Sequence, residues 1–362
     1  MHTYFLGLSL VGYDSLWGRM VRSGVAGAIG SVKRTGIFPN GDALRTSFTG
    51  LAGVDQYLIP AVIFYNNILS NGSANDRMLL ISLFTTMQTM SHCMLVLGWN
   101  RGKRPWWATW EHLFWGVYNQ AWGAAAVYPL YCFSHAEGFL RDNETETDEQ
   151  RPIGPSDPTE ALALIPTAIL GSITPAMLLY PAFNPGCDTG LRQGIIAFYR
   201  FTPLALALAH PFFSSVQKKA QGSYQWKSPP IKSESLVATS LVISGAVATV
   251  GHGWALLGSI SSGIRGVFWP SKQLNLVSPM MIADGARDFL QWDIIVITAA
   301  LVPFADQVLK SSGLVRRLRK RNKLFSILSD SFIGRMALLT LASGILSPGA
   351  VVAFSLAVRS YT

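Results

Sequence analysis

Charged residues are scarce in this chain: 14% of its 362 residues are charged and 49% are hydrophobic. About a quarter of the residues of a soluble domain are usually charged. The apolar residues here gather in runs of roughly 20, the length that crosses the hydrocarbon core of a bilayer as a helix. The sequence therefore argues against an ordinary soluble domain and predicts an all-α, polytopic bundle of transmembrane helices.

Several chemical signatures are also missing. Cys93, Cys132 and Cys187 are too few for a disulfide framework, and no CxxC pair or His/Cys cluster indicates zinc. There is no DDxxD or NDxxxD motif to chelate Mg²⁺ around a prenyl diphosphate, and no P-loop or GxSxG motif. We therefore expect no metal, no cofactor and no diphosphate-ionising chemistry.

The chain is nevertheless basic, with 29 Lys and Arg against 20 Asp and Glu, a net charge of +9. No basic folded domain remains once the apolar runs are set aside. We interpret the excess as loop charge that sets membrane topology, and we expect no nucleic-acid partner. The expected location is a multi-pass position in a membrane, that of the endoplasmic reticulum.

Hydropathy predicts about eight spans, some of them broken by proline. Residues 1–46 are mildly apolar and glycine-rich, and we predict an interfacial or re-entrant arm there, followed by one transmembrane helical domain over 47–362. Polar loops are expected at 134–157 and 217–234, and a basic amphipathic helix on the membrane surface within 310–334. The predicted spans cover residues 51–69, 78–98, 106–133, 159–182, 194–216, 236–260, 289–309 and 335–358.

The third predicted span carries one acid in a row of aromatic residues. The spacing of 4, 4, 3 and 4 residues places them on one helix face. A carboxyl group in apolar surroundings can stay protonated and act as an acid, and aromatic faces stabilise a nearby cation. The alternative is an aromatic belt at the membrane interface. The residues of this row are Trp107, Glu111, Trp115, Tyr118 and Trp122.

Two further acids open apolar runs. Asp55 lies about one turn inside the first span, with Asn66 on nearly the same face. Asp293 opens the long run of the seventh span beside Phe289 and Trp292. Each could be a catalytic acid, or an acid at a helix start that is favoured by the helix dipole. We predict that Asp55, Glu111 and Asp293 share one enclosed chamber.

Two histidines inside predicted spans are candidates for substrate binding. His92 lies in the second span and His252 in the sixth. Either could relay a proton or position a substrate oxygen. The alternative is a hydrogen bond between helices.

Two short motifs resemble a known family. Phe48-Thr49-Gly50 followed by Asp55, and the segment from Phe289 to Asp293, resemble motifs of fungal integral-membrane terpene cyclases of meroterpenoid pathways, such as those for ascochlorin, ascofuranone and macrophorin. The resemblance covers the chain from about residue 47 onward. Tyr65 stands where we expect Phe.

The resemblance implies a metal-independent cyclisation. A protonated acid would open a terminal epoxide, or protonate a terminal alkene, on a farnesyl chain attached to an aromatic or polyketide head. Asp55 and Asp293 match the motif positions. The implied partners are a hydrophobic substrate, such as a prenylated phenol, and the lipid bilayer. The alternatives are a small-molecule transporter, with broken helices and buried acids along its path, or a non-catalytic membrane scaffold.

Overall fold

The fold is described here from a computed structural model, which describes residues 1–99, 105–144, 153–184, 186–223, 232–261, 263–270, 280–313 and 331–361. Within these ranges the regular structure is helical, and the only β pairing is an isolated bridge between Ile37 and Ala43. The predicted all-α class is therefore confirmed.

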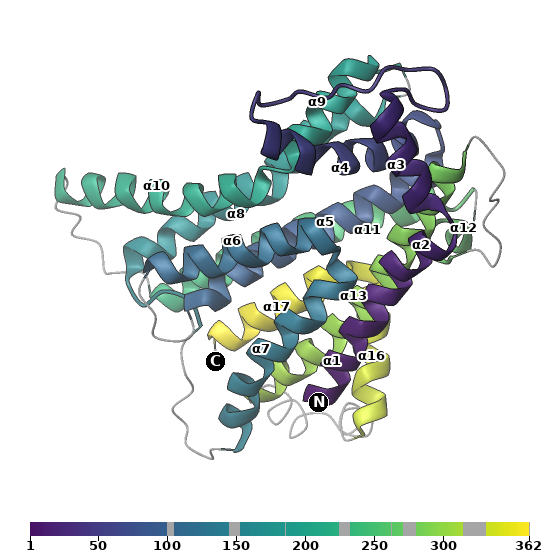
Figure 1. Cartoon of the computed structure of the whole chain (residues 1–362). Coiled ribbons are helices and arrows are strands. Elements are labelled where there is room, and N and C mark those ends of the chain that lie inside the picture. The colour runs from purple at the N-terminus through teal and green to yellow at the C-terminus, as the bar shows by residue number, and fades with distance from the viewer. Residues whose placement is uncertain are drawn as a thin grey trace.

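Four helices form the centre of the bundle (Figure 1): α5 (Ala74–Gly98), α11 (Ser233–Gly258), α13 (Met281–Ser311) and α17 (Pro348–Tyr361). α11 packs against both α5 and α17, and α13 packs against α17. α5 is buried on nearly every side from Leu79 to Gly98, a stretch that contains no Asp, Glu, Lys or Arg. The core of the protein lies between these helices.

The remaining long helices surround this centre. α8 (Pro158–Leu179) and α10 (Thr202–Ser223) pack on each other, and α10 projects from the body (Figure 1). α6 (Pro105–Trp122) packs against α5 and α10, and α7 (Ala124–Glu144) packs against α13. α4 (Ala52–Ser70) contacts α13 and the short α9 (Thr189–Tyr199).

The third predicted span is wrong as a single helix. Gly123 has a φ of +88°, a conformation that glycine adopts readily and L-residues rarely do, and it separates α6 from α7. The predicted loop that begins at 134 is helical up to Glu144, and α10 extends to Ser223 into the second predicted loop. The basic amphipathic helix predicted within 310–334 falls largely on residues 314–330, which lie outside the described residues.

Two other predicted spans are bent. α9 and α10 meet at 53°, and α16 (Phe332–Leu346) and α17 meet at 115°. Among the described residues, four helices are long and apolar enough to cross a membrane, or up to six if each bent pair counts as one span. α8 continues through Pro166 and Pro175, so these two prolines do not end the helix.

The first 35 residues pack onto the bundle. They form α1 (His2–Tyr13), the π-helix η1 (Asp14–Gly18), α2 (Arg19–Arg22) and α3 (Val25–Thr35). α1 lies against α7 and α13 (Figure 1), and Ser9 Oγ donates a hydrogen bond of 2.7 Å to the carbonyl oxygen of Ala126. An interfacial or re-entrant location for this arm stays a prediction.

Candidate active site

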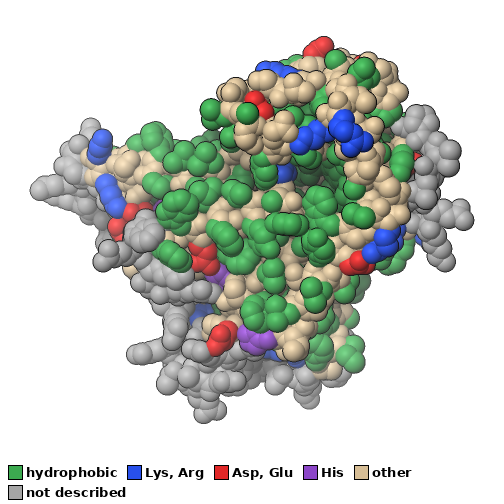
Figure 2. All heavy atoms as spheres, in the orientation of Figure 1, with side chains coloured by type: hydrophobic (Ala, Val, Ile, Leu, Met, Phe, Trp, Pro, Cys, Tyr) green, Lys and Arg blue, Asp and Glu red, His purple; other side chains and the backbone are tan. Residues whose placement is uncertain are grey.

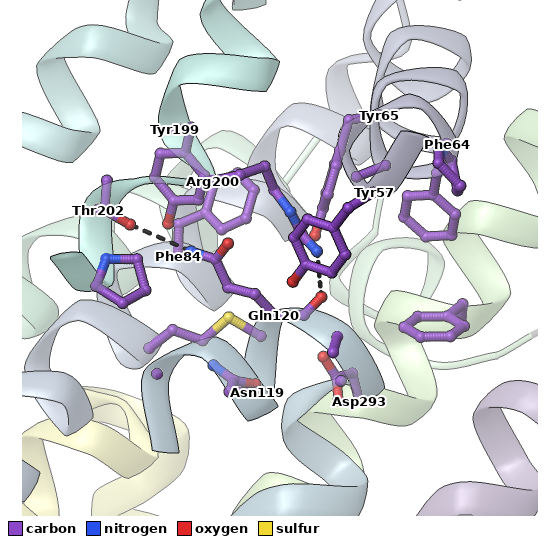
Figure 3. Close-up of a pocket in the computed structure, with 18 of the residues that line it drawn as sticks. Tyr57, Phe64, Tyr65, Phe84, Asn119, Gln120, Tyr199, Arg200, Thr202 and Asp293 are labelled. Carbon is purple, nitrogen blue, oxygen red and sulfur yellow. Dashed lines mark hydrogen bonds between the residues drawn. The ribbon is translucent and has the colours of Figure 1, made fainter. Parts of the chain in front are cut away.

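A cavity of about 470 Å³ lies between the N-terminal arm and helices α4, α5, α6, α10 and α13. Its walls are mainly apolar and aromatic, as in most small-molecule sites. Figure 3 shows several of these side chains converging on one space. The aromatic residues of the lining are Trp17, Tyr57, Phe64, Tyr65, Phe84, Trp115, Tyr128, Tyr199 and Phe289.

Asp293 is the only carboxylic acid among the described lining residues. It is 1% exposed, and its Oδ1 accepts a hydrogen bond of 2.5 Å from the backbone N–H of Ala125. The break at Gly123 makes this possible, because it leaves the first N–H groups of α7 without partners inside that helix. Asp293 therefore has two roles. It accepts a hydrogen bond from a backbone N–H in the first turn of α7, and it presents a carboxyl group to the cavity (Figure 3).

Aromatic rings surround the space beside this acid. The ring of Phe289 lies 5.2 Å from Phe64 and 5.9 Å from Trp17, centroid to centroid, both edge to face. The row of rings continues from Phe64 through Tyr65 to Phe84, which lies 5.0 Å from Tyr199. Such rings stabilise a cation that passes over their faces, and they exclude water.

A polar group of residues occupies another part of the cavity. Arg200 donates a hydrogen bond from Nη2 to the carbonyl oxygen of Gln120, and its guanidinium carbon lies 5.6 Å from the centre of the Tyr57 ring. Gln120 in turn donates to Thr202 Oγ1 at 3.3 Å. Sequence reasoning missed this group. The available signal was Arg200 itself, the only charged residue within the predicted fifth span, 194–216.

Of the predicted site residues, the structure brings three to the cavity: Asp293, Phe289 and Trp115. The other two acids do not line it, so the three acids do not share one chamber. Trp292 also lies outside the lining, with the guanidinium carbon of Arg19 5.4 Å from its ring centre.

Asp55 holds the turn before α4. Its Oδ1 accepts hydrogen bonds from Phe48 N at 3.1 Å, Thr49 N at 2.8 Å and Thr49 Oγ1 at 2.9 Å. This geometry fits the alternative role of an acid at a helix start. It also explains why Thr49 and Asp55 occur together in the first motif.

Glu111 is paired away from the cavity. Its Oε1 lies 2.9 Å from Nε2 of the buried His135. Trp107 and Trp122 are 42% and 41% exposed, and Tyr118 stacks on Phe114 at 5.7 Å. Two of the four aromatic residues in the predicted row are therefore exposed, as the alternative of an aromatic belt expects, whereas Trp115 lines the cavity.

The polar candidates inside the bundle connect helices. His92 Nε2 lies 3.1 Å from Ser240 Oγ, and His252 lies 2.7 Å from Ser82 Oγ and 3.1 Å from the carbonyl oxygen of Gly344. Asn66 is 1% exposed and its side-chain oxygen has no hydrogen-bond partner in the described part of the chain, but it does not line the cavity. For both histidines the geometry is that of an interhelical hydrogen bond.

Comparison with known proteins identifies the family. The profile of the CtvD domain matches residues 1–360. The chain belongs to the CtvD-domain family. It is 33% identical over 380 residues to terpene cyclase alnG of Emericella nidulans, a match that covers 98% of this chain and 93% of the relative.

Two more distant relatives are also terpene cyclases by name. Terpene cyclase DEP1 of Alternaria brassicicola is 26% identical, with 99% of this chain and 97% of the relative covered, and terpene cyclase DEP1 of Fusarium langsethiae is 25% identical, with 98% and 96% covered. No solved structure matches the chain. The predicted resemblance to fungal terpene cyclases is confirmed, and with it the enzyme class. The CtvD match also includes the N-terminal arm, which the two motifs did not cover.

Proposed function

We propose that this protein is an integral-membrane terpene cyclase in which Asp293 protonates the end of a prenyl chain. The observation that carries the proposal is one buried carboxyl group in the wall of an aromatic cavity. An isolated charge is costly to bury, so a neutral carboxylic acid is the form we expect before reaction.

The substrate class is a farnesylated aromatic or polyketide compound. The second carboxyl oxygen, Oδ2, would carry the proton, because Oδ1 accepts the Ala125 N–H. The proton passes to a terminal epoxide oxygen or alkene carbon, and an internal alkene attacks the resulting cationic carbon. Loss of a proton or addition of water ends the reaction, and Asp293 regains a proton. Phe64, Phe289 and Trp115 would stabilise the cation.

The outer surface supports a location in the membrane. Trp110, Phe114, Leu208 and Phe212 on α6 and α10 are between 57% and 63% exposed. In Figure 2 hydrophobic side chains cover the middle of the face, and most of the charged side chains lie nearer its margins. Extensive exposed apolar surface marks a membrane or partner contact.

The experiment uses microsomes that contain the protein and a prenylated phenol, supplied with and without a terminal epoxide. The product of cyclisation without added water is an isomer of the precursor, so retention time must be read together with mass. We expect conversion that EDTA does not abolish. EDTA-sensitive conversion would contradict the mechanism, and transfer of unchanged substrate across vesicles would favour a transporter. Alkaline carbonate should leave the protein in the membrane pellet, whereas release into the supernatant would contradict the membrane location.

A further inference from the structure

Arg200 places a positive charge in a cavity whose only described acid does not neutralise it. The residue lies between α9 and α10, and Figure 3 shows its guanidinium group pointing into the cavity near Tyr57 and Gln120. Asp293 lies away from Arg200 in the same view. In the part of the chain that the structure describes, Arg200 forms no ion pair with any carboxylate; its hydrogen bond is to a backbone carbonyl oxygen.

Two lining residues also have buried polar atoms without partners among the described residues. Nε of Arg200 is a donor and Oδ1 of Asn119 is an acceptor. Buried polar groups are nearly always hydrogen-bonded, and an unsatisfied one is costly. A ligand that carries both an acceptor oxygen and a hydroxyl group would satisfy both atoms.

We propose, on the basis of the proposed function, that Arg200 binds an acidic oxygen of the substrate's non-terpenoid head, in the form of a phenolate, enolate or carboxylate. Guanidinium groups bind such oxygens by charge-assisted hydrogen bonds. The Tyr57 ring beside the guanidinium limits its movement. With its head at Arg200, the substrate extends its hydrocarbon tail along the aromatic walls toward Asp293. Arg200 is thus a binding residue that determines which end of the substrate meets the acid.

The test compares two substrates in three variants. One substrate is a prenylated phenol, and the other is its O-methyl ether, which has the same tail and no acidic oxygen. Arg200→Met removes the charge, Arg200→Lys keeps the charge without the planar donor group, and Arg265→Met removes an exposed arginine of α12 (Ile264–Phe268) as the control.

We expect Arg200→Met to raise KM for the free phenol by about 10-fold or more and to change kcat much less. The methyl ether should bind to the wild type and to Arg200→Met equally well. Arg200→Lys should give an intermediate KM, and Arg265→Met should match the wild type. An equal loss for both substrates, or no change for either, would overturn the inference.

A binding measurement separates this inference from the cyclase proposal. Tryptophan fluorescence of the Asp293→Asn protein reports ligand binding without turnover, because Trp17 and Trp115 line the cavity. Stronger binding of the phenol than of its ether, lost in Asp293→Asn/Arg200→Met, supports the head-binding site even if no cyclisation is detected. Equal binding of the two ligands in Asp293→Asn overturns it even if the enzyme is a cyclase. Melting temperatures in detergent identify any variant that fails to fold. If Arg200→Met does not fold, the Arg200→Lys variant is the test. An unchanged preference of Arg200→Lys for the phenol over its ether overturns the proposal, and a reduced preference supports it.

Discussion

The carboxyl group of Asp293 on α13 accepts a hydrogen bond of 2.5 Å from the backbone N–H of Ala125 in the first turn of α7. One side chain thus joins two helices that are far apart in sequence and also faces the cavity. A substitution at this position must therefore be designed to separate the structural role from the chemical one.

Asp293→Asn makes that separation. The amide oxygen of Asn can still accept the Ala125 N–H, whereas the amide cannot supply the acidic proton. We expect turnover to fall about 100-fold or more while the melting temperature in detergent stays close to that of the wild type. Asp293→Leu is the matched control for structure, and it should destabilise the fold by about 1–3 kcal/mol because the N–H of Ala125 is left buried without an acceptor. A fully active Asp293→Asn protein would remove Asp293 from the mechanism.

Variants of Asp55 and Glu111 test the sequence-based hypothesis that three acids are catalytic. Because both lie outside the cavity, we expect Asp55→Ala to lower stability by about 1–2 kcal/mol, and Glu111→Gln to weaken the contact with His135. The kcat of the folded fraction should remain near that of the wild type in both variants. A collapse of kcat with unchanged stability would instead support acid catalysis at that residue.

Gly12 tests the packing of the N-terminal arm. A Cβ atom at Gly12 would lie 2.1 Å from the carbonyl oxygen of Ala125, whereas a Cβ at Gly7 on the same helix would meet nothing within 4 Å. Gly12→Ala should destabilise the protein by about 1–3 kcal/mol, because two backbones must separate. Gly7→Ala should be neutral or slightly stabilising through helix propensity. Equal melting temperatures for the two variants would show that α1 does not pack on α7.

An ion pair between Arg19 and Asp288 joins the middle of this arm to α13. Arg19 donates from Nε and Nη2 to the two carboxyl oxygens of Asp288 at 2.8 and 3.1 Å, and the two side chains are 33% and 6% exposed. Since solvent partly screens Arg19, we expect a coupling energy on the order of 1 kcal/mol in a double-mutant cycle of Arg19→Met and Asp288→Asn. Purely additive effects on unfolding would contradict the pairing. Because Trp17 and Met20 flank Arg19 and line the cavity, the single variants should also raise KM.

The sequence by itself determined the helical class and the family. A helix satisfies the backbone groups of a long apolar run within the run itself, so long apolar runs with few charges indicated the helical class. The two short motifs also correspond to local structure. Thr49 donates hydrogen bonds to Asp55 in the turn before α4. Phe289 and Asp293 lie one helical turn apart and line the same cavity.

Only the tertiary structure decided which acid faces the cavity and what lies around it. Asp55, Glu111 and Asp293 are alike in sequence, since each lies in or at the start of an apolar run that also holds aromatic residues. Their surroundings come from other helices: His135 on α7 pairs with Glu111, and Ala125 with Asp293. Arg200 faces the cavity because α9 ends and α10 begins at an angle there. The prolines of the fifth predicted span indicated a break, but not which side chains the break turns toward a cavity. Helix periodicity determines which residues share a face of a helix. The packing of helices that are distant in sequence determines which residues that face contacts.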